Sequence, residues 1–227
     1  FESCAGGGGR NDPGMLAFAP QAWISDDTDA VERQKIQYGT SMVYPLVAMG
    51  AHVSAVPNHQ TGRITPLDTR AAVAFFGNLG YELDPRALAE GEAAQVRAQI
   101  DWYKERRGLL HGGRFHRLLS PFEGDGNETA WMVVAEDRSR ALVGWYRTLT
   151  VPLPGPSVLR LRGLDPAARY RVTVWPAADD ALTRANELER GGDELMSRGL
   201  FLDDLAWEAQ ARGDFQARIF ELLEVST

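Results

Sequence analysis

The chain has 227 residues, of which 44% are hydrophobic and 24% charged, with a net charge of −7. This composition is typical of an ordinary globular protein, and the negative charge argues against nucleic acid, whose phosphates need basic patches. No run of about 18 apolar residues occurs, so we expect no contact with a membrane. The single cysteine, Cys4, excludes an internal disulfide and fits a reducing compartment, so we expect a cytoplasmic protein.

The first half of the chain alternates strand and helix patterns. Expected strands lie at 22–24, around 51–53 and at 79–83, and expected helices at 29–38, 66–76 and 92–110. Asp27 or Thr28 is the predicted cap of the first helix, which Gly39 ends, and Thr65 is the predicted cap of the second. Such alternation predicts a parallel α/β sheet or barrel.

The pattern changes after Gly113. Expected strands lie at 114–118, 129–135, 141–148, 158–162, 170–175 and 215–225. Their short turns predict an antiparallel β domain. The acidic stretch 179–212 is predicted to be mostly loop, with one helix at 182–189. We therefore expect two domains, at 1–111 and 112–227.

The stretch 23–29, Trp-Ile-Ser-Asp-Asp-Thr-Asp, places three carboxylates within four residues of one another behind an indole. Sugars stack on indole faces, and paired carboxyl groups cleave glycosidic bonds, so the stretch suggests a sugar site. Adjacent side chains on a strand point to opposite faces, so Asp26 and Asp27 are expected to diverge. The alternative is that these carboxylates only cap the next helix, the more frequent role of such residues.

Other candidate residues also have a structural interpretation. Trp23 alone is more often a core residue than a sugar platform, and Cys4 alone is more often a small buried hydrophobe than a nucleophile. The glycines at 6–9 either present N–H groups to a ligand or form a flexible turn. His52 is expected to be a hydrogen-bonded structural residue or a support for a site. The four histidines lack zinc-ligand spacing, so we expect no metal.

Several long motifs go beyond such patterns. They are Glu2-Ser3-Cys4-Ala5-Gly6-Gly7-Gly8-Gly9-Arg10, the run from Trp23 to Arg33, 36–41, 49–60, 76–84, 119–123 and 213–216. Together they closely resemble the α-galactosidases, or melibiases, of glycoside hydrolase family 36. The resemblance covers nearly the whole chain and is least distinctive at 176–212.

The resemblance implies a fold and a set of site residues. Family members are retaining enzymes with a nucleophilic and an acid/base aspartate in a (β/α)₈ barrel, which a C-terminal β domain follows. By resemblance Asp26 is the catalytic acid/base, Cys4 and Gly7 contact the galactose, and Trp23 lines the same pocket. The family's nucleophile lies in a Lys-Trp-Asp motif on an earlier barrel strand, and this motif does not occur here.

We therefore expect the C-terminal half of the barrel at 1–111, followed by an antiparallel β-sandwich at 112–227. The chain then begins near the fifth barrel strand, and as an isolated piece it is expected to be inactive. The implied activity is hydrolysis of terminal α-galactosides of the melibiose and raffinose type, without metal or cofactor, in a homo-oligomer that is commonly a tetramer. The alternatives are an α-N-acetylgalactosaminidase, a galactosyl-transferring member of the family, and a non-catalytic carbohydrate-binding module.

Overall fold

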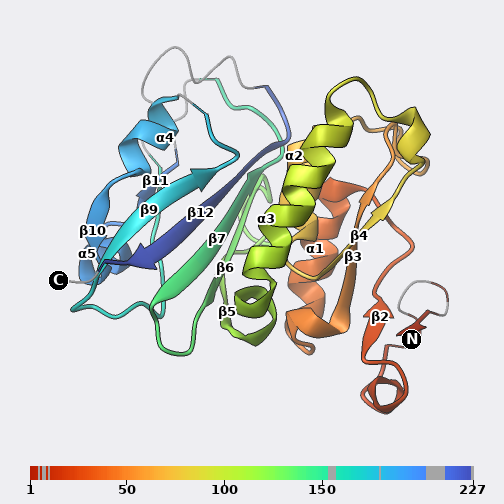
Figure 1. Ribbon diagram of the computed structural model, residues 1–227, viewed down its shortest axis with the longest axis horizontal. Helices are drawn as coiled ribbons and strands as arrows, with labels where there is room; N and C mark the ends of the chain where they lie inside the picture. Colours follow the sequence, from red (N-terminus) through yellow and green to blue (C-terminus); the bar gives the residue numbers. More distant parts are fainter. Residues whose placement is uncertain are drawn as a thin grey trace. The chain divides into compact units, whose positions relative to one another are not determined.

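The structure is a computed structural model, and it describes residues 1–4, 6, 9, 11–152, 157–178, 180–202 and 213–225. The chain divides into two compact units, Phe1–Gly112 and Gly113–Thr227. Figure 1 traces both along the sequence from red to blue. Each unit has its own main sheet.

The first unit contains a four-stranded parallel sheet. Its strands are β1 (Glu2–Ser3), β2 (Gln21–Trp23), β3 (Met49–Ser54) and β4 (Asn78–Glu82). The spatial order β1-β2-β3-β4 is also the order in the chain. Because each crossover moves one strand along in the same direction with the same hand, the connecting helices lie on one face of the sheet.

Three helices and three 3₁₀ turns complete this unit. The helices are α1 (Ala30–Thr40), α2 (Leu67–Ala74) and α3 (Glu92–Gly112), and the turns are η1 (Met15–Ala17), η2 (Leu46–Ala48) and η3 (Pro85–Ala87). Met49, Ala51 and Val53 alternate along β3 and are wholly buried. The Tyr103 hydroxyl of α3 accepts from the Leu79 N–H of β4 at 3.3 Å, which ties the longest helix to the sheet.

The helix starts differ from the predicted ones. Asp29, and not Asp27 or Thr28, caps α1, because its carboxylate accepts from the N–H groups of Val31 and Glu32. Gly39 does not end this helix, which continues to Thr40. The α2 helix begins after Pro66 without a side-chain cap. The predicted cap, Thr65, instead offers its carbonyl to Arg70 Nε at 3.2 Å.

The second unit is built on a six-stranded antiparallel sheet in the order β10-β9-β12-β7-β6-β5. The strands are β5 (Arg114–Leu119), β6 (Glu128–Val134), β7 (Arg140–Arg147), β9 (Arg169–Trp175), β10 (Glu189–Gly191) and β12 (Gln216–Glu224). A separate pair joins β8 (Val158–Leu159) to β11 (Leu200–Phe201). One hydrophobic core unites the sheet, through Met132, Trp145 and Phe220, with Leu159 and Leu200 of this pair.

The stretch predicted to be mostly loop is largely ordered structure where it is described. It contains α4 (Ala181–Asn186) and α5 (Gly192–Ser197) as well as β10 and β11. Asn186 holds it together, because its side-chain amide donates to Leu182 O and Phe201 O and accepts from the Phe201 N–H. Residues 203–212 lie outside the described part.

The order of structure types agrees with the sequence-based expectation: parallel α/β first, then an antiparallel sheet. Within the described residues, no helix combines the length and apolar character that a membrane span requires.

Candidate active site

The predicted site residues that the structure describes lie at the carboxyl ends of β1 and β2. Cys4 directly follows β1, and Trp23 is the last residue of β2. The two strands are parallel neighbours, with Ser3 paired to Ala22, so Cys4 and Trp23 emerge side by side. Asp26 follows three residues later, whereas Gly7 lies outside the described residues. Parallel α/β folds place their ligands at this edge.

The three carboxylates of the acidic stretch have different surroundings. Asp29 is 2% exposed and caps α1. Asp27 is half-buried, and its Oδ1 accepts from the Asp29 N–H at 3.0 Å. Asp26 is exposed and makes no hydrogen bond or ion pair with another described residue. Of the three, Asp26 is therefore the carboxylate with neither oxygen engaged within the described chain.

Asp29 is held ionised by its partners. Burial alone would raise the pKa of this carboxyl, but hydrogen bonds from the Thr61 hydroxyl and from the Glu32 and Val31 N–H groups, with the charge of Arg63, lower it below its ordinary 3.8. The Thr61 hydroxyl donates to Oδ2 at 2.7 Å, and Arg63 pairs with Oδ1. Burial of a carboxylate is tolerated because it is paired and hydrogen-bonded.

A second loop is bonded to the stretch that carries Asp26. The Thr28 N–H donates to Gln60 Oε1 at 3.2 Å, and Asn58 Nδ2 donates to the Thr28 hydroxyl at 3.1 Å. Together with the Thr61 and Arg63 contacts, these bonds join residues 25–29 to residues 58–63, and we call this arrangement the loop clamp. It fixes the backbone immediately after Asp26.

Arg33 supports the same backbone from the other side. It is 2% exposed, and its guanidinium donates to Ser25 O at 3.3 Å and to Gly50 O at 3.0 Å. Its Cζ also lies 4.9 Å from the centre of the Trp23 ring, a cation–π distance. Burial lowers the pKa of Arg33 to about 10, against the opposing charges of Asp27, Glu82 and Glu2, so the group stays cationic at neutral pH.

Trp23 packs against both Arg33 and His52. The Trp23 and His52 rings lie 4.2 Å apart, centre to centre, at 32°. A Cβ atom at Gly80 would overlap the His52 ring, so glycine is what admits the imidazole beside β4. Burial lowers the pKa of His52, with Glu2 and Glu82 opposing and Arg33 reinforcing the shift. The imidazole packs against the Trp23 ring in a tilted arrangement. Among the described residues it makes no hydrogen bond, contrary to the expectation.

The structure shows the burial of two of these candidates. Cys4 is an exposed free thiol, so its interpretation as a small buried hydrophobe was wrong. Trp23 is buried, as a core residue would be. Among the residues that the structure describes, no three His, Cys, Asp or Glu side chains gather as metal ligands.

Arg33 is the residue that the sequence analysis missed. The buried positions of α1 include Arg33, Gln34 and Gln37 together with Ala30 and Tyr38. Polar residues therefore interrupt the apolar stripe from which a sheet-facing side is normally recognised. The one available signal was the spacing, since Arg33 lies one helical turn after the capping Asp29.

Comparison with known families accounts for both units. The Melibiase model matches residues 1–113, and the model of the glycosyl hydrolase family 36 C-terminal domain matches residues 128–222. The chain belongs to glycoside hydrolase family 36.

Particular relatives are α-galactosidases. The chain is 54% identical over 202 residues to alpha-galactosidase AgaA of Geobacillus stearothermophilus, covering 89% of this chain and 26% of that protein. It is 42% identical over 226 residues to alpha-galactosidase Mel36A of Lactobacillus acidophilus, covering 100% of this chain and 28% of that protein. The chain thus spans about a quarter of the length of these relatives.

Solved structures agree in fold. The α-galactosidase of Lactobacillus brevis superposes with a TM-score of 0.89 at 47% identity, covering 100% of this chain and 29% of that one. A variant of AgaA in complex with raffinose superposes with a TM-score of 0.87 at 50% identity, covering 99% and 29%.

Proposed function

We propose that this chain carries the acid/base side of the active site of a retaining α-galactosidase. In this proposal Asp26 is the acid/base, Cys4 and Gly7 contact the galactose, and Trp23 forms one wall of the pocket. The substrates are terminal α-galactosides of the melibiose and raffinose type. Relatives in complex with raffinose and with stachyose support this substrate class.

The proposal includes a role for each unit. Residues 1–111 form part of a (β/α)₈ catalytic barrel, and residues 112–227 form a β-sandwich domain. The barrel is supported by the consecutive parallel order β1-β2-β3-β4, because a sheet that winds in one direction with its helices on one face can close on itself.

Retaining chemistry needs two carboxyl groups about 5 Å apart. Asp26 would first donate its proton to the departing glycosidic oxygen while the second carboxylate attacks the anomeric carbon. It would then take a proton from the water that releases the galactosyl group. Because the sequence has no Lys-Trp-Asp motif, we propose that the nucleophile lies outside these 227 residues.

One observation carries the assignment of Asp26. Of the three neighbouring carboxylates, Asp27 and Asp29 are engaged within the described chain, whereas Asp26 is exposed and without such a partner. A group that transfers protons to a substrate must be accessible, whereas Asp29 is occupied by capping α1 and Asp27 accepts from the Asp29 N–H.

The test is Asp26→Asn in the full open reading frame that encodes this chain. With a substrate whose leaving group needs protonation, such as melibiose, kcat/KM should fall by about 10²- to 10⁴-fold, the usual contribution of a general acid. With a dinitrophenyl galactoside the first step needs no proton, so added azide should restore turnover by replacing the water that Asp26 no longer activates.

The matched control is Asp27→Asn, which keeps an oxygen to accept the Asp29 N–H. We expect it to change kcat/KM far less than Asp26→Asn. Full melibiose hydrolysis by the Asp26→Asn protein would show that Asp26 is not the acid/base, and equal losses in both variants would contradict the distinction drawn from their surroundings.

The proposed enzyme is a homo-oligomer, as the family resemblance implies. Sedimentation of the full-length protein at several concentrations tests this. A single monomeric species throughout would contradict it.

A further inference from the structure

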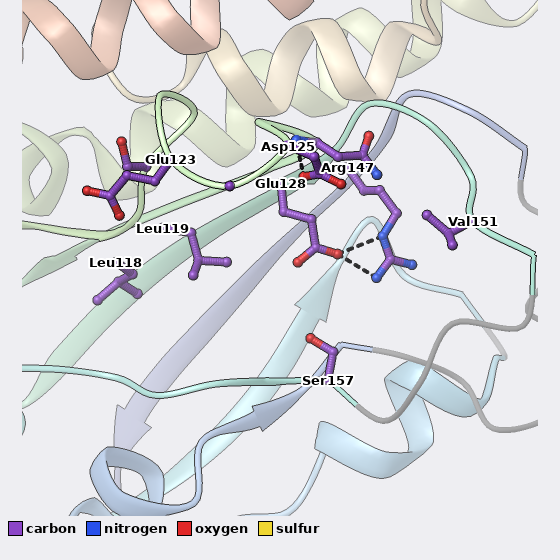
Figure 2. Close-up of a pocket in the computed structure, with 11 residues that line it drawn as sticks. Leu118, Leu119, Glu123, Asp125, Glu128, Arg147, Val151 and Ser157 are labelled. Carbon is purple, nitrogen blue, oxygen red and sulfur yellow. Dashed lines mark hydrogen bonds and ion pairs between the residues drawn. The ribbon is translucent and has the colours of Figure 1, made fainter.

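A cavity of about 470 Å³ lies within the second unit, and it shares no residue with the candidate active site. Its size falls within the usual range of small-ligand pockets. Figure 2 shows its labelled residues. Its lining combines apolar, hydroxyl and charged side chains: Leu118, Leu119, Ser120, Glu123, Asp125, Glu128, Arg147, Val151 and Ser157.

A cross-strand ion pair forms the floor of this cavity. Glu128 at the start of β6 is the direct partner of Arg147 at the end of β7. Arg147 Nε and Nη2 donate to the same oxygen, Glu128 Oε1, at 2.7 and 2.5 Å. Arg147 is 7% exposed, and its Cζ lies 5.0 Å from the centre of the ring of the wholly buried Trp145. The pair therefore seals one end of the hydrophobic core and faces the cavity.

The pair leaves an acceptor directed at the cavity. Glu128 Oε2 makes no hydrogen bond to another described residue, and Figure 2 shows both dashed lines running to the other oxygen of this carboxylate. The Ser157 hydroxyl likewise has no partner in the described chain, and in Figure 2 it points towards Glu128. The Ser120 hydroxyl accepts from the Phe122 N–H, which leaves its own proton to donate.

The walls are apolar on two sides. Leu118 and Leu119 lie on one side of the ion pair in Figure 2, and Val151 lies on the other. The loop before Val151 is held in place by Asn127, whose side-chain amide donates to Leu149 O at 3.0 Å and accepts from the Leu149 N–H at 2.8 Å. The cavity thus has a hydrogen-bonded loop at its edge as well as polar groups in its lining.

The charges of the lining restrict the ligand class. Glu123, Asp125 and Glu128 outnumber Arg147, whose charge Glu128 already balances, so phosphates and carboxylates are disfavoured. Within the described chain the acids do not gather as a cation site requires. Carboxylate and hydroxyl oxygens between apolar walls match the alternating O–H and C–H groups of a sugar ring.

We propose that this cavity is a second saccharide-binding site, which takes a neutral mono- or disaccharide unit and performs no chemistry. Glu128 Oε2 accepts hydrogen bonds from sugar hydroxyls, the Ser157 hydroxyl donates or accepts one, and Leu118, Leu119 and Val151 contact the C–H groups. Such a site would bind part of an oligosaccharide substrate, or it would keep the protein attached to galactoside-rich material.

The test is methyl-detected NMR of the full-length protein with labelled Leu and Val side chains, titrated with galactose, melibiose and raffinose. The catalytic site is first saturated with the inhibitor 1-deoxygalactonojirimycin. We expect saturable shifts of the Leu118, Leu119 and Val151 methyl signals. This readout is independent of hydrolysis, so the proposed function and this site can fail separately.

Two variants and one control localise the effect. Ser157→Ala removes a single hydroxyl and should weaken binding by about three- to tenfold, the worth of one hydrogen bond. Glu128→Gln should weaken it further, and thermal unfolding shows whether that protein is still folded. Glu136→Gln, the same chemical change at an exposed position of this unit, should leave the affinity unchanged.

Unmoved methyl signals would overturn the proposal, as would equal affinities in Ser157→Ala and the unchanged protein. Shifts that appear with spermidine but with none of the sugars would also overturn it, because the cavity would then be a site for cationic ligands.

Discussion

A buried guanidinium requires partners, and Arg33 finds them in two backbone carbonyls, that of Ser25 just after β2 and that of Gly50 near the start of β3. The Ser25 carbonyl precedes Asp26 by one residue, so this bond helps to set where the proposed acid/base stands. Stacking on Trp23 adds a side-chain contact to the same support. Arg33 is thus a positioning residue, with no expected contact to substrate.

We predict that Arg33→Met lowers the free energy of unfolding by about 2–3 kcal/mol, because two carbonyls lose a charged donor. Arg33→Lys should recover part of this loss, since an ammonium keeps the charge but not the planar fork. Chemical denaturation measures both. The control is Lys35→Met, two positions along the same helix and largely in solvent, which should change stability by less than about 0.5 kcal/mol.

The residue scale also shows the limit of sequence reasoning. We expected strand geometry to make Asp26 and Asp27 diverge, but both residues lie beyond β2, which ends at Trp23. Asp27 is the engaged one, through a local bond from the Asp29 N–H. The bonds that Thr28 and Asp29 make with residues 58–61, about thirty positions further along the chain, were likewise outside the reach of a local pattern. Capping preference pointed to Asp27 or Thr28, whereas tertiary bonds from Thr61 and Arg63 favour Asp29 as the cap.

At the scale of elements, the loop clamp joins the start of α1 to the loop after β3. Asp29 both caps the helix and binds the loop. Its Oδ1 caps α1 and pairs with Arg63, and its Oδ2 accepts from the Thr61 hydroxyl. The capping bond and the tertiary bonds therefore depend on the same ionised group.

We predict that Asp29→Asn lowers the free energy of unfolding by about 1–2 kcal/mol at neutral pH, because the amide still caps but loses its charge-assisted bonds. The folded-state pKa of Asp29 lies below 3.8, so the unfolded chain binds its proton first on acidification. The contribution is complete above pH 3.8 and is lost as the pH falls through the lower folded value.

Urea unfolding of both proteins from neutral pH into acid measures this difference. The difference in the free energy of unfolding between the two proteins should be constant at neutral pH and shrink once the pH passes below the ordinary pKa of aspartate. Asp101→Asn, at an exposed position of α3, should show no such trend. A difference between Asp29→Asn and the unchanged protein that grew in acid would contradict the assigned sign.

At the scale of the whole molecule, each unit buries its own core. The first buries alternating residues of β3, and the second centres on a sheet whose inner face includes Leu222 of β12. Local damage should therefore be felt mainly within one unit.

We predict that Leu222→Ala destabilises the second unit by about 2–5 kcal/mol, as expected for a wholly buried leucine. Hydrogen exchange should accelerate at the amides of β9 and β12 and stay unchanged in β3. The adjacent Leu223→Ala, at a side chain that is 38% exposed, should have a much smaller effect. Equal acceleration in β3 would show that the units unfold as one.

Much of the architecture could be predicted from the sequence, because apolar residues recur at regular spacing in the strands and long helices. The helix expected at 92–110 is α3, and the strands expected at 129–135 and 141–148 are β6 and β7. Between 180 and 202, only the helix expected at 182–189 has a counterpart, α4. The elements β10, α5 and β11 were not predicted, because such short elements depend on contacts like those of Asn186 with Phe201. No local pattern encodes a partner of that kind.

The loop clamp also has a consequence for evolution and protein engineering. The side chains of residues 25–29 and 58–63 depend on one another, so we expect the two loops to change together although they are separated in the sequence. A chimera that takes one loop from a relative with different clamp residues would leave Asp29 or Thr28 with mismatched partners, whereas exchanging both loops together would preserve them. Recombination within this family should therefore succeed more often when its crossover points fall outside 25–63.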